Sequence, residues 1–256
     1  MRVRQLGGPQ GEPHTMLKYI LALPALLGTA SIAHAADINL IDQLQEGGAA
    51  IVVTIGLSIL FVAVTIERLL HLRARAVVPA GLADEARALW TSPDPATLHA
   101  VAHDSNSTLG RIIAYMAAQR SQPHAYVSSG AGDIASLELR HHQQKFYALS
   151  IVATVAPIVG LLGTVVGMIE AFNVIAYQEG MGNPALLAGG ISKALINTAA
   201  GLAVALPALG MHHYFKHRLA FYSLELEKQV NALLREWFVP SAAVDTPNLH
   251  MVHHAH

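Results

Sequence analysis

Residues 146–169, FYALSIVATVAPIVGLLGTVVGMI, form a charge-free apolar run between Lys145 and Glu170. Two further runs share this character, residues 47–66 and residues 194–215. The hydrocarbon core of a bilayer is about 30 Å thick, and about 20 helical residues cross it. Each of the three runs is therefore long enough to span a membrane, and the sequence predicts an all-α membrane protein.

The composition of the whole chain supports this class. Of its 256 residues, 53% are hydrophobic and only 13% are charged, whereas a soluble domain carries about 25% charged residues. Sixteen Lys and Arg against 17 Asp and Glu leave no basic excess for nucleic acid. The chain has no cysteine, which excludes thiolate metal sites and cysteine nucleophiles. We expect no cofactor, no metal site and no enzymatic activity.

A shorter apolar stretch near the N-terminus predicts a signal peptide. One positive charge precedes apolar residues 19–32, which lead into an Ala33-His34-Ala35 cleavage pattern. Residues 1–35 are thus predicted to be a signal peptide, of which residues 1–15 would precede the true start. An uncleaved anchor is the alternative, and it would give four spans and reverse the orientation of everything downstream.

The distribution of Lys and Arg favours a cleaved signal and three spans. Residues 68–145 carry eight of them and the tail after the third run carries four, whereas residues 178–188 carry none. Basic segments stay on the cytoplasmic side of the inner membrane, so we expect a periplasmic N-terminus and a cytoplasmic C-terminus. The predicted segments are a periplasmic segment 36–48, a first span 49–70, a cytoplasmic helical domain 71–145, a second span 146–178, a periplasmic loop 179–187, a third span 188–216, a cytoplasmic helix 217–240 and a disordered, histidine-containing tail 241–256.

Short breaks divide the cytoplasmic segment into helices. Asp94 before Pro95 is typical of an N-cap followed by a first helical residue. Residues 105–107, Ser-Asn-Ser, precede another stretch with helical periodicity. Residues 128–132, Ser-Ser-Gly-Ala-Gly, predict a further break before a long helix over residues 134–177. That helix is too long for the membrane alone, so we expect its first third to project into the cytoplasm.

Small residues recur at three- and four-residue steps on the second and third runs. Such stripes let helix backbones approach closely in lipid, where packing drives association. Plain bundle packing explains them without any further function, and it remains the alternative to a functional interface. The members are Ala153, Pro157, Gly160, Thr164, Gly167 and Ala171 in one run, and Ala194, Thr198, Gly201, Ala205 and Ala208 in the other.

The same stretches resemble a known family. Residues 156–172 (APIVGLLGTVVGMIEAF), residues 190–208 (GISKALINTAAGLAVALPA) and residues 66–69 (IERL) are similar to signatures of the ExbB/TolQ/MotA ion-channel family, and most similar to its ExbB branch. The resemblance covers about residues 40–238. It assigns helix packing to Pro157, Gly160, Gly163, Gly167, Gly201 and Pro207.

The resemblance implies a pentamer whose second and third spans line a central pore. Single-span ExbD-like partners, each with an essential Asp, would sit inside the pore, and proton flow would drive a TonB-like periplasmic effector. Thr164 and Thr198 fall on the family's pore threonines, and Asn197 joins them in the ion pathway. The implied function is an ExbB-like subunit of a proton-driven energy-transducing motor. A TolQ-like subunit for envelope integrity and division, or a non-conducting membrane scaffold, is the alternative.

Lys193 departs from the family pattern, which has Glu at this position. Intramembrane charges usually face the protein interior or water, so we expect Lys193 to face the pore, where five copies would repel one another. The partner's Asp, or Glu170 near the same end, would relieve that repulsion, and Lys193 would tune the partner's acid. A Lys that snorkels to the periplasmic interface is the alternative. Glu67 is expected to be an interface anchor or to pair locally with Arg68.

Overall fold

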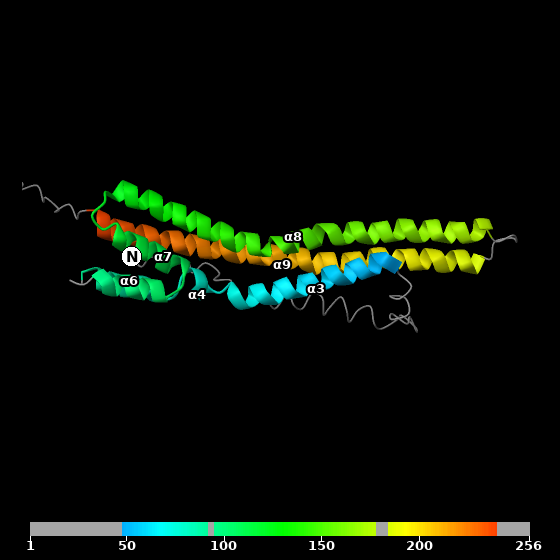
Figure 1. The fold of residues 1–256 in the computed structure, drawn as a ribbon, viewed down its shortest axis with the longest axis horizontal. Helices are drawn as coiled ribbons and strands as arrows, with labels where there is room; N and C mark the ends of the chain where they lie inside the picture. The colour runs from blue at the N-terminus through cyan, green and yellow to red at the C-terminus, as the bar shows by residue number, and fades with distance from the viewer. Residues whose placement is uncertain (1–47, 92–94, 178–183, 240–256) are drawn as a thin grey trace, which may run out of the picture. The chain divides into compact units, whose positions relative to one another are not determined.

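The computed structural model describes residues 48–91, 95–177 and 184–239, and within these ranges the chain is helical without any strand (Figure 1). The predicted all-α class is confirmed. The helices are α3 (Gly48–His71), α4 (Ala74–Val77), α5 (Leu82–Trp90), α6 (Pro95–Asp104), α7 (Thr108–Ala118), α8 (His124–Tyr177) and α9 (Pro184–Phe238).

The chain divides into two compact units, and α8 and α9 contribute to both. Unit 1 contains α3 with the later part of α8, from residue 139, and the earlier part of α9, to residue 221. Unit 2 contains α4 to α7, the first part of α8 and the last part of α9. Each unit has its own core, and each is described separately below.

Three helices in the described residues are long and apolar enough to cross a membrane, namely Gly48–His71, His124–Asn173 and Leu187–Phe238. The three apolar runs of the sequence fall on these helices, while the membrane boundaries assigned above stay predictions. The signal peptide and the C-terminal tail lie outside the described residues. The predicted loop 179–187 overlaps α9, because this helix already begins at Pro184, a residue favoured in a first helical turn.

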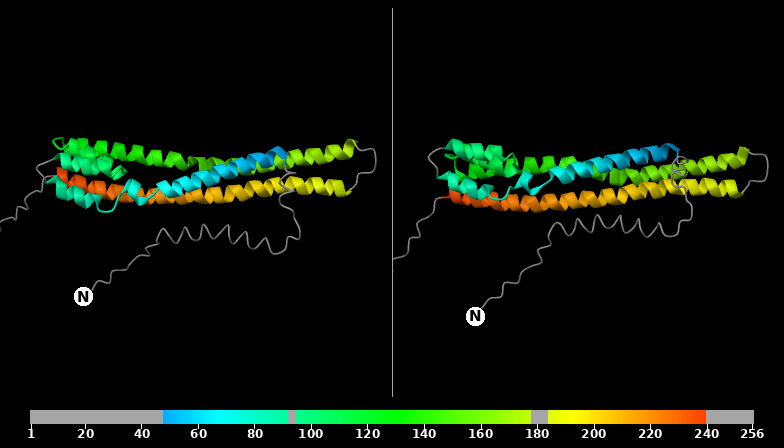
Figure 2. Two further views of the ribbon diagram at one scale, coloured as in Figure 1. Left: turned by 60° about the horizontal axis from the view of Figure 1, so that its bottom comes forward. Right: turned by 90° about the horizontal axis from the view of Figure 1, so that it is seen from below.

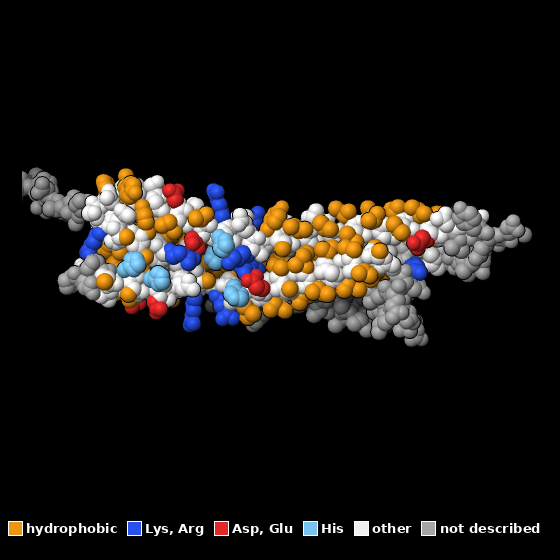
Figure 3. Space-filling model, in the orientation of Figure 1, with side chains coloured by type: hydrophobic (Ala, Val, Ile, Leu, Met, Phe, Trp, Pro, Cys, Tyr) orange, Lys and Arg blue, Asp and Glu red, His pale blue; other side chains and the backbone are white. Residues whose placement is uncertain are grey.

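α3 has one face inside unit 1 and another on its surface. Ile51 and Thr54 are buried, whereas Val52 is 70% exposed and Ile59 is 65% exposed. Figures 1 and 2 show α3 alongside the unit 1 parts of α8 and α9. Apolar side chains dominate the surface over these helices in Figure 3. Large apolar residues at this exposure suit contact with lipid rather than water.

α7 supplies the core of unit 2, and its first turn explains where it begins. Ser107 has an extended backbone, and its side-chain oxygen accepts a hydrogen bond from the Gly110 amide at 3.0 Å. This N-cap confirms the helix expected after residues 105–107. Pro95 begins α6 as predicted, while Asp94 lies outside the described residues. The fully buried apolar side chains of α7 are Leu109, Ile112, Ile113 and Met116.

The end of α9 is fastened to α5 by stacked rings. Trp237 lies parallel to Trp90, with ring centroids 4.1 Å apart and planes 2° apart. The Arg120 guanidinium lies 4.3 Å from the Trp90 ring centroid, and Arg87 Nε donates to Glu236 Oε2 at 3.0 Å. The last part of α9 therefore belongs to the same unit as α4 to α7, a grouping that the sequence analysis had not made.

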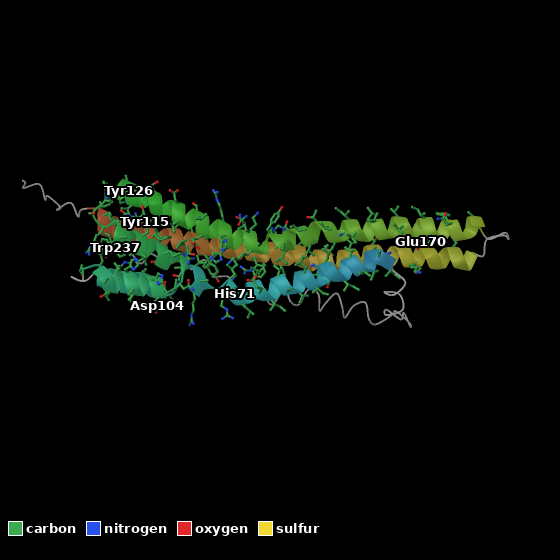
Figure 4. The ribbon with its side chains drawn as sticks, in the orientation of Figure 1. His71, Asp104, Tyr115, Tyr126, Glu170 and Trp237 are labelled. Carbon is green, nitrogen blue, oxygen red and sulfur yellow. The ribbon has the colours of Figure 1, made fainter. Side chains whose placement is uncertain are left out.

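The predicted break at residues 128–132 is wrong. α8 runs without interruption from His124 to Tyr177. A glycine is needed at position 130 for packing, because a Cβ there would overlap the ring of Tyr115 on α7, which is labelled in Figure 4. The glycine serves the close approach of α7 to α8, and it does not end a helix.

Gly130→Ala should destabilise unit 2, because the added methyl group would force the Tyr115 ring to move. Overpacking costs about 1–3 kcal/mol, against a helix-propensity gain of up to about 1 kcal/mol. We expect a lower midpoint of thermal unfolding by tryptophan fluorescence, which reports on unit 2 because both tryptophans lie there. Gly132→Ala is the matched control, since nothing lies within 4 Å of its Cβ position. Equal midpoints for the two variants would contradict the contact.

Candidate functional site

In unit 1, α8 and α9 approach each other through glycine and alanine. A Cβ placed on Gly160 would lie 2.7 Å from the carbonyl oxygen of Asn197, and one placed on Gly201 would lie 2.5 Å from the carbonyl oxygen of Ala156. Neither position has room for a methyl group. The two small-residue stripes thus face each other, and close backbone packing replaces the hydrophobic effect that lipid cannot supply.

The contact continues toward the ends of α8 and α9 that adjoin residues 178–183. A Cβ on Gly167 would lie 3.1 Å from the Ala194 methyl group, and one on Gly190 would lie 2.5 Å from the Ala171 methyl group. Pro157 and Pro207 lie within α8 and α9, and both helices continue past them. Proline has no backbone N–H, so each removes one hydrogen bond from its helix.

Two threonines meet within this contact. The side-chain oxygens of Thr164 and Thr198 lie 2.5 Å apart. Thr164 Oγ1 also lies 3.0 Å from the carbonyl oxygen of Ala194 and 3.2 Å from that of Gly160. Thr198 Oγ1 lies 3.3 Å from the same Gly160 carbonyl. The pair therefore links the two helices through hydroxyl and carbonyl groups.

These distances allow two arrangements in which both hydroxyl hydrogens bond to the facing helix, because each hydroxyl has one hydrogen and two lone pairs. In the first, Thr198 donates to Thr164, which donates to the Ala194 carbonyl. In the second, Thr164 donates to Thr198, which donates to the Gly160 carbonyl. Both arrangements use both hydrogens and leave a lone pair on each oxygen. The pair can accept a hydrogen bond from a third group without losing either internal bond.

Asn197 lies deeper than the threonine pair, and only 5% of it is exposed. A Cβ built on Gly163 would lie 2.8 Å from both Cβ and Cγ of Asn197, and 2.7 Å from the Ala50 methyl group of α3. The Asn197 side-chain oxygen is buried without a hydrogen-bond partner. Such an oxygen costs about 1–3 kcal/mol. Its burial places Asn197 inside the contact of α3, α8 and α9. Its role in the ion pathway stays a prediction.

Lys193 and Glu170 lie at the same end of the α8–α9 contact. Lys193 is half-buried and directly precedes Ala194, which packs against Gly167. Glu170 follows Gly167 by less than one helical turn and is exposed on α8, where Figure 4 labels it. The structure therefore places the two charges near the same end of the α8–α9 contact, beyond the Gly167–Ala194 contact.

Glu67 lies at the opposite end of unit 1. It pairs with the adjacent Arg68, which is buried, and its carboxylate is 3.8 Å from His71 Nδ1. Along α3, Glu67 lies about 25 Å from Ala50, the residue that meets Asn197. The structure thus gives Glu67 local partners and does not bring it to the other site residues.

Comparison with known proteins identifies the part of the chain that carries this site. Residues 107–228 match the model of the MotA/TolQ/ExbB proton channel family. The predicted resemblance to this family is confirmed. Thr164, Thr198 and Lys193 all lie inside the matched segment. Together with the three apolar helices, the match supports a multi-pass protein of the bacterial inner membrane.

Individual ExbB proteins align with parts of the chain. The biopolymer transport protein exbB1 of Vibrio cholerae is 37% identical over 90 residues, which are 34% of this chain and 40% of that protein. The ExbB-like 1 protein of Helicobacter pylori is 41% identical over 85 residues, 33% of this chain and 44% of that protein. The chain thus spans less than half the length of these two relatives. The ExbB-like 3 protein of Synechocystis is 26% identical over 175 residues, 67% of this chain and 82% of that protein.

The inner face of α3 carries polar residues that the sequence analysis missed. Thr54 is buried and donates to the Ala50 carbonyl at 2.9 Å, while the buried Thr65 side-chain oxygen has no hydrogen-bond partner among the described residues. Ser58 lies between them on the same helical face and is half-buried. Hydroxyl residues at helical spacing in an apolar run are the signal that could have found this face of α3.

The histidines form no metal site in the part of the chain that the structure describes. No group of three or more His, Asp or Glu side chains there could hold a metal ion. His212 packs edge-on against Phe146, with ring centroids 5.7 Å apart. The histidines of the tail, residues 241–256, lie outside the described residues.

Gly201→Ala should separate α8 from α9, because the new methyl group would meet the Ala156 carbonyl and the Gly160 Cα. We expect a loss of about 1–3 kcal/mol in the free energy of unfolding in detergent, measured by circular dichroism. Gly210→Ala on the same helix is the matched control, since nothing lies within 4 Å of its Cβ position. If both variants unfolded alike, the close approach of the two helices would not be a source of stability.

Proposed function

We propose that this chain is an ExbB-like subunit of a proton-driven motor in the bacterial inner membrane. The observation that carries the proposal is the hydroxyl pair of Thr164 and Thr198, which lies between two apolar helices inside the segment matched to the proton channel family. Polar groups in a low-dielectric interior are costly unless they are hydrogen-bonded. A pair that both donates and accepts is suited to exchange hydrogen bonds with a titrating group from a partner.

The proposed assembly is a pentamer in which α8 and α9 line a central pore. Single-span ExbD-like helices would occupy the pore, and a TonB-like periplasmic protein would receive the work. The N-terminus would be periplasmic and the C-terminus cytoplasmic. Exposed apolar side chains on α8 and α9, such as Leu161 at 59% and Leu206 at 62%, are available for contact with neighbouring copies or with lipid.

The hydroxyl pair favours one protonation state of a partner carboxyl group. A protonated carboxyl can donate to a lone pair of Thr164 or Thr198 without breaking any bond of the pair. An ionised carboxylate needs a donor, and either hydroxyl can supply one only by releasing its bond to a carbonyl oxygen or to the other hydroxyl. The protonated partner would therefore dock at the pair and the ionised partner would leave it, which couples proton uptake to helix movement.

Lys193 would act on the same partner acid from the end of the helix contact. A positive charge nearby stabilises the ionised form of a carboxyl group. Lys193 in each subunit would therefore delay protonation of the partner's acid to lower pH. The half-buried position of Lys193 also supports the alternative that the protein is a non-conducting scaffold, because a fixed positive charge opposes the passage of protons.

Thr164→Val and Thr198→Val should each reduce proton flux by about five- to tenfold, since each removes one hydrogen bond of about 1–1.5 kcal/mol. Flux is measured with a pH-sensitive dye in proteoliposomes that contain the full chain and its ExbD-like partner. Thr198→Ser should retain the flux. Thr154→Val is the matched control, because this exposed threonine of α8 bonds only within its own helix.

Three outcomes would overturn the proposal. If the valine variants conduct as well as the native chain, the hydroxyl pair has no role in proton passage. If the native chain with its partner conducts no protons, the protein is a scaffold. If it conducts, but its deletion impairs envelope integrity and leaves TonB-dependent uptake intact, the TolQ-like alternative replaces the ExbB-like one.

Lys193→Ala should move the pH of half-maximal flux upward, because the partner's acid would then hold its proton at higher pH. Lys193→Glu should move it further in the same direction. Both are measured from the pH dependence of flux in the same proteoliposomes, with Lys228→Ala in unit 2 as the control. An unchanged profile in both Lys193 variants would show that this residue does not tune the partner.

A further inference from the structure

The end of unit 1 that carries Glu67 is strongly basic. Residues 67–73, 139–146 and 212–218 contribute six Lys and Arg and six His, against one carboxylate. That carboxylate, Glu67, already pairs with Arg68. On the face drawn in Figure 3, Lys, Arg and His side chains gather where the apolar surface ends. We call Arg73, Arg140, Lys145, Lys216 and Arg218 the basic collar.

α8, α9 and the residues directly after α3 contribute to the collar near one level. Gly163 of α8 lies against Ala50 of α3 and Asn197 of α9, so these three residues lie at the same height along the three helices. α8 runs antiparallel to α3 and α9. From this level, a distance of about 25 Å toward the collar therefore leads to lower residue numbers on α8 and to higher residue numbers on α3 and α9. The equivalent positions are Glu67, Phe146 and Tyr214.

Contacts between aromatic rings agree with this alignment. Phe146 and Phe215 are buried against each other, with ring centroids 6.1 Å apart. Lys145 and Lys216, each adjacent in sequence to one of these rings, are both exposed. Arg218 donates to the Tyr214 hydroxyl at 3.0 Å. The two exposed lysines therefore lie on neighbouring helices at the same height.

The collar lies where lipid headgroups are expected. On α9, the stretch without charge from Lys193 to Lys216 rises about 34 Å, close to the hydrocarbon thickness of about 30 Å. Tyr147, next to Lys145 and Phe146, is 61% exposed, and tyrosine is enriched at the boundary between membrane and water. This position holds whichever side of the membrane the collar faces.

We propose that the basic collar binds the headgroups of anionic phospholipids in preference to zwitterionic ones. The phosphodiester of an anionic lipid offers oxygen acceptors to Lys and Arg without the ammonium group that opposes them in zwitterionic lipids. Residues 139–150 and 208–221 contain no Asp or Glu that would neutralise the site. Glu138, the next acid along α8, accepts a hydrogen bond from Arg111 at 2.5 Å.

The test uses the full chain in phosphatidylcholine bilayers with trace spin-labelled lipid. Electron paramagnetic resonance gives the fraction of labelled lipid that the protein immobilises. We expect labelled phosphatidylglycerol to associate at least about threefold more strongly than labelled phosphatidylcholine, since each basic residue near a membrane surface favours anionic lipid. The Lys145→Gln/Lys216→Gln double variant should bring that ratio close to one.

Matched variants separate headgroup binding from loss of structure. Lys145→Arg/Lys216→Arg should keep the preference, and so should Lys228→Gln, which removes an exposed lysine of unit 2. A ratio near one in the native chain, or an unchanged ratio in the glutamine double variant, would overturn the proposal. Replacing chloride by inorganic phosphate at constant ionic strength should have no effect. If phosphate alone abolished the preference, the collar would be a site for free phosphate and not for lipid.

Discussion

The close approach of α8 and α9 at Gly160 and Gly201 is the constraint on which unit 1 depends. Helices in lipid gain nothing from burying one apolar surface against another, so their contact rests on dispersion forces and on polar bonds across a short gap. At Gly201, a Cβ would come within 3.1 Å of the Gly160 Cα. Only at such a distance can the hydroxyls of Thr164 and Thr198 reach each other and the carbonyl oxygens of the facing helix.

The polar groups of unit 1 differ in their hydrogen bonding and in their position along the helices relative to this contact. The threonine pair is satisfied within the two helices, whereas the buried oxygen of Asn197 has no partner in the described part of the chain. Lys193 lies at one boundary of the apolar stretch and the basic collar lies at the other. Unit 1 thus combines a hydroxyl pair between two apolar helices with charged residues at both ends of the apolar stretch.

Charge-free runs and residue spacing were enough to predict the three apolar helices and the small-residue stripes, because both patterns are local. Gly130 shows the limit: a glycine that ends a helix and a glycine that admits a ring from another helix look alike until Tyr115 is placed beside it. The stacking of Trp90 on Trp237 joins residues far apart in sequence, so no window of sequence could reveal it. Asn197 directly precedes Thr198 in sequence, and only the position of α3 showed that Asn197 is buried.

Because each residue turns an α-helix by about 100°, the contact between α8 and α9 tolerates substitution far better than insertion. Gly160 and Gly167 lie seven residues apart, as do Ala194 and Gly201 that face them. One residue added between Gly160 and Gly167 would turn one of them away and bring a bulkier neighbour such as Leu161 toward α9. The spacing of the small residues within each helix is therefore a requirement of the contact in its own right.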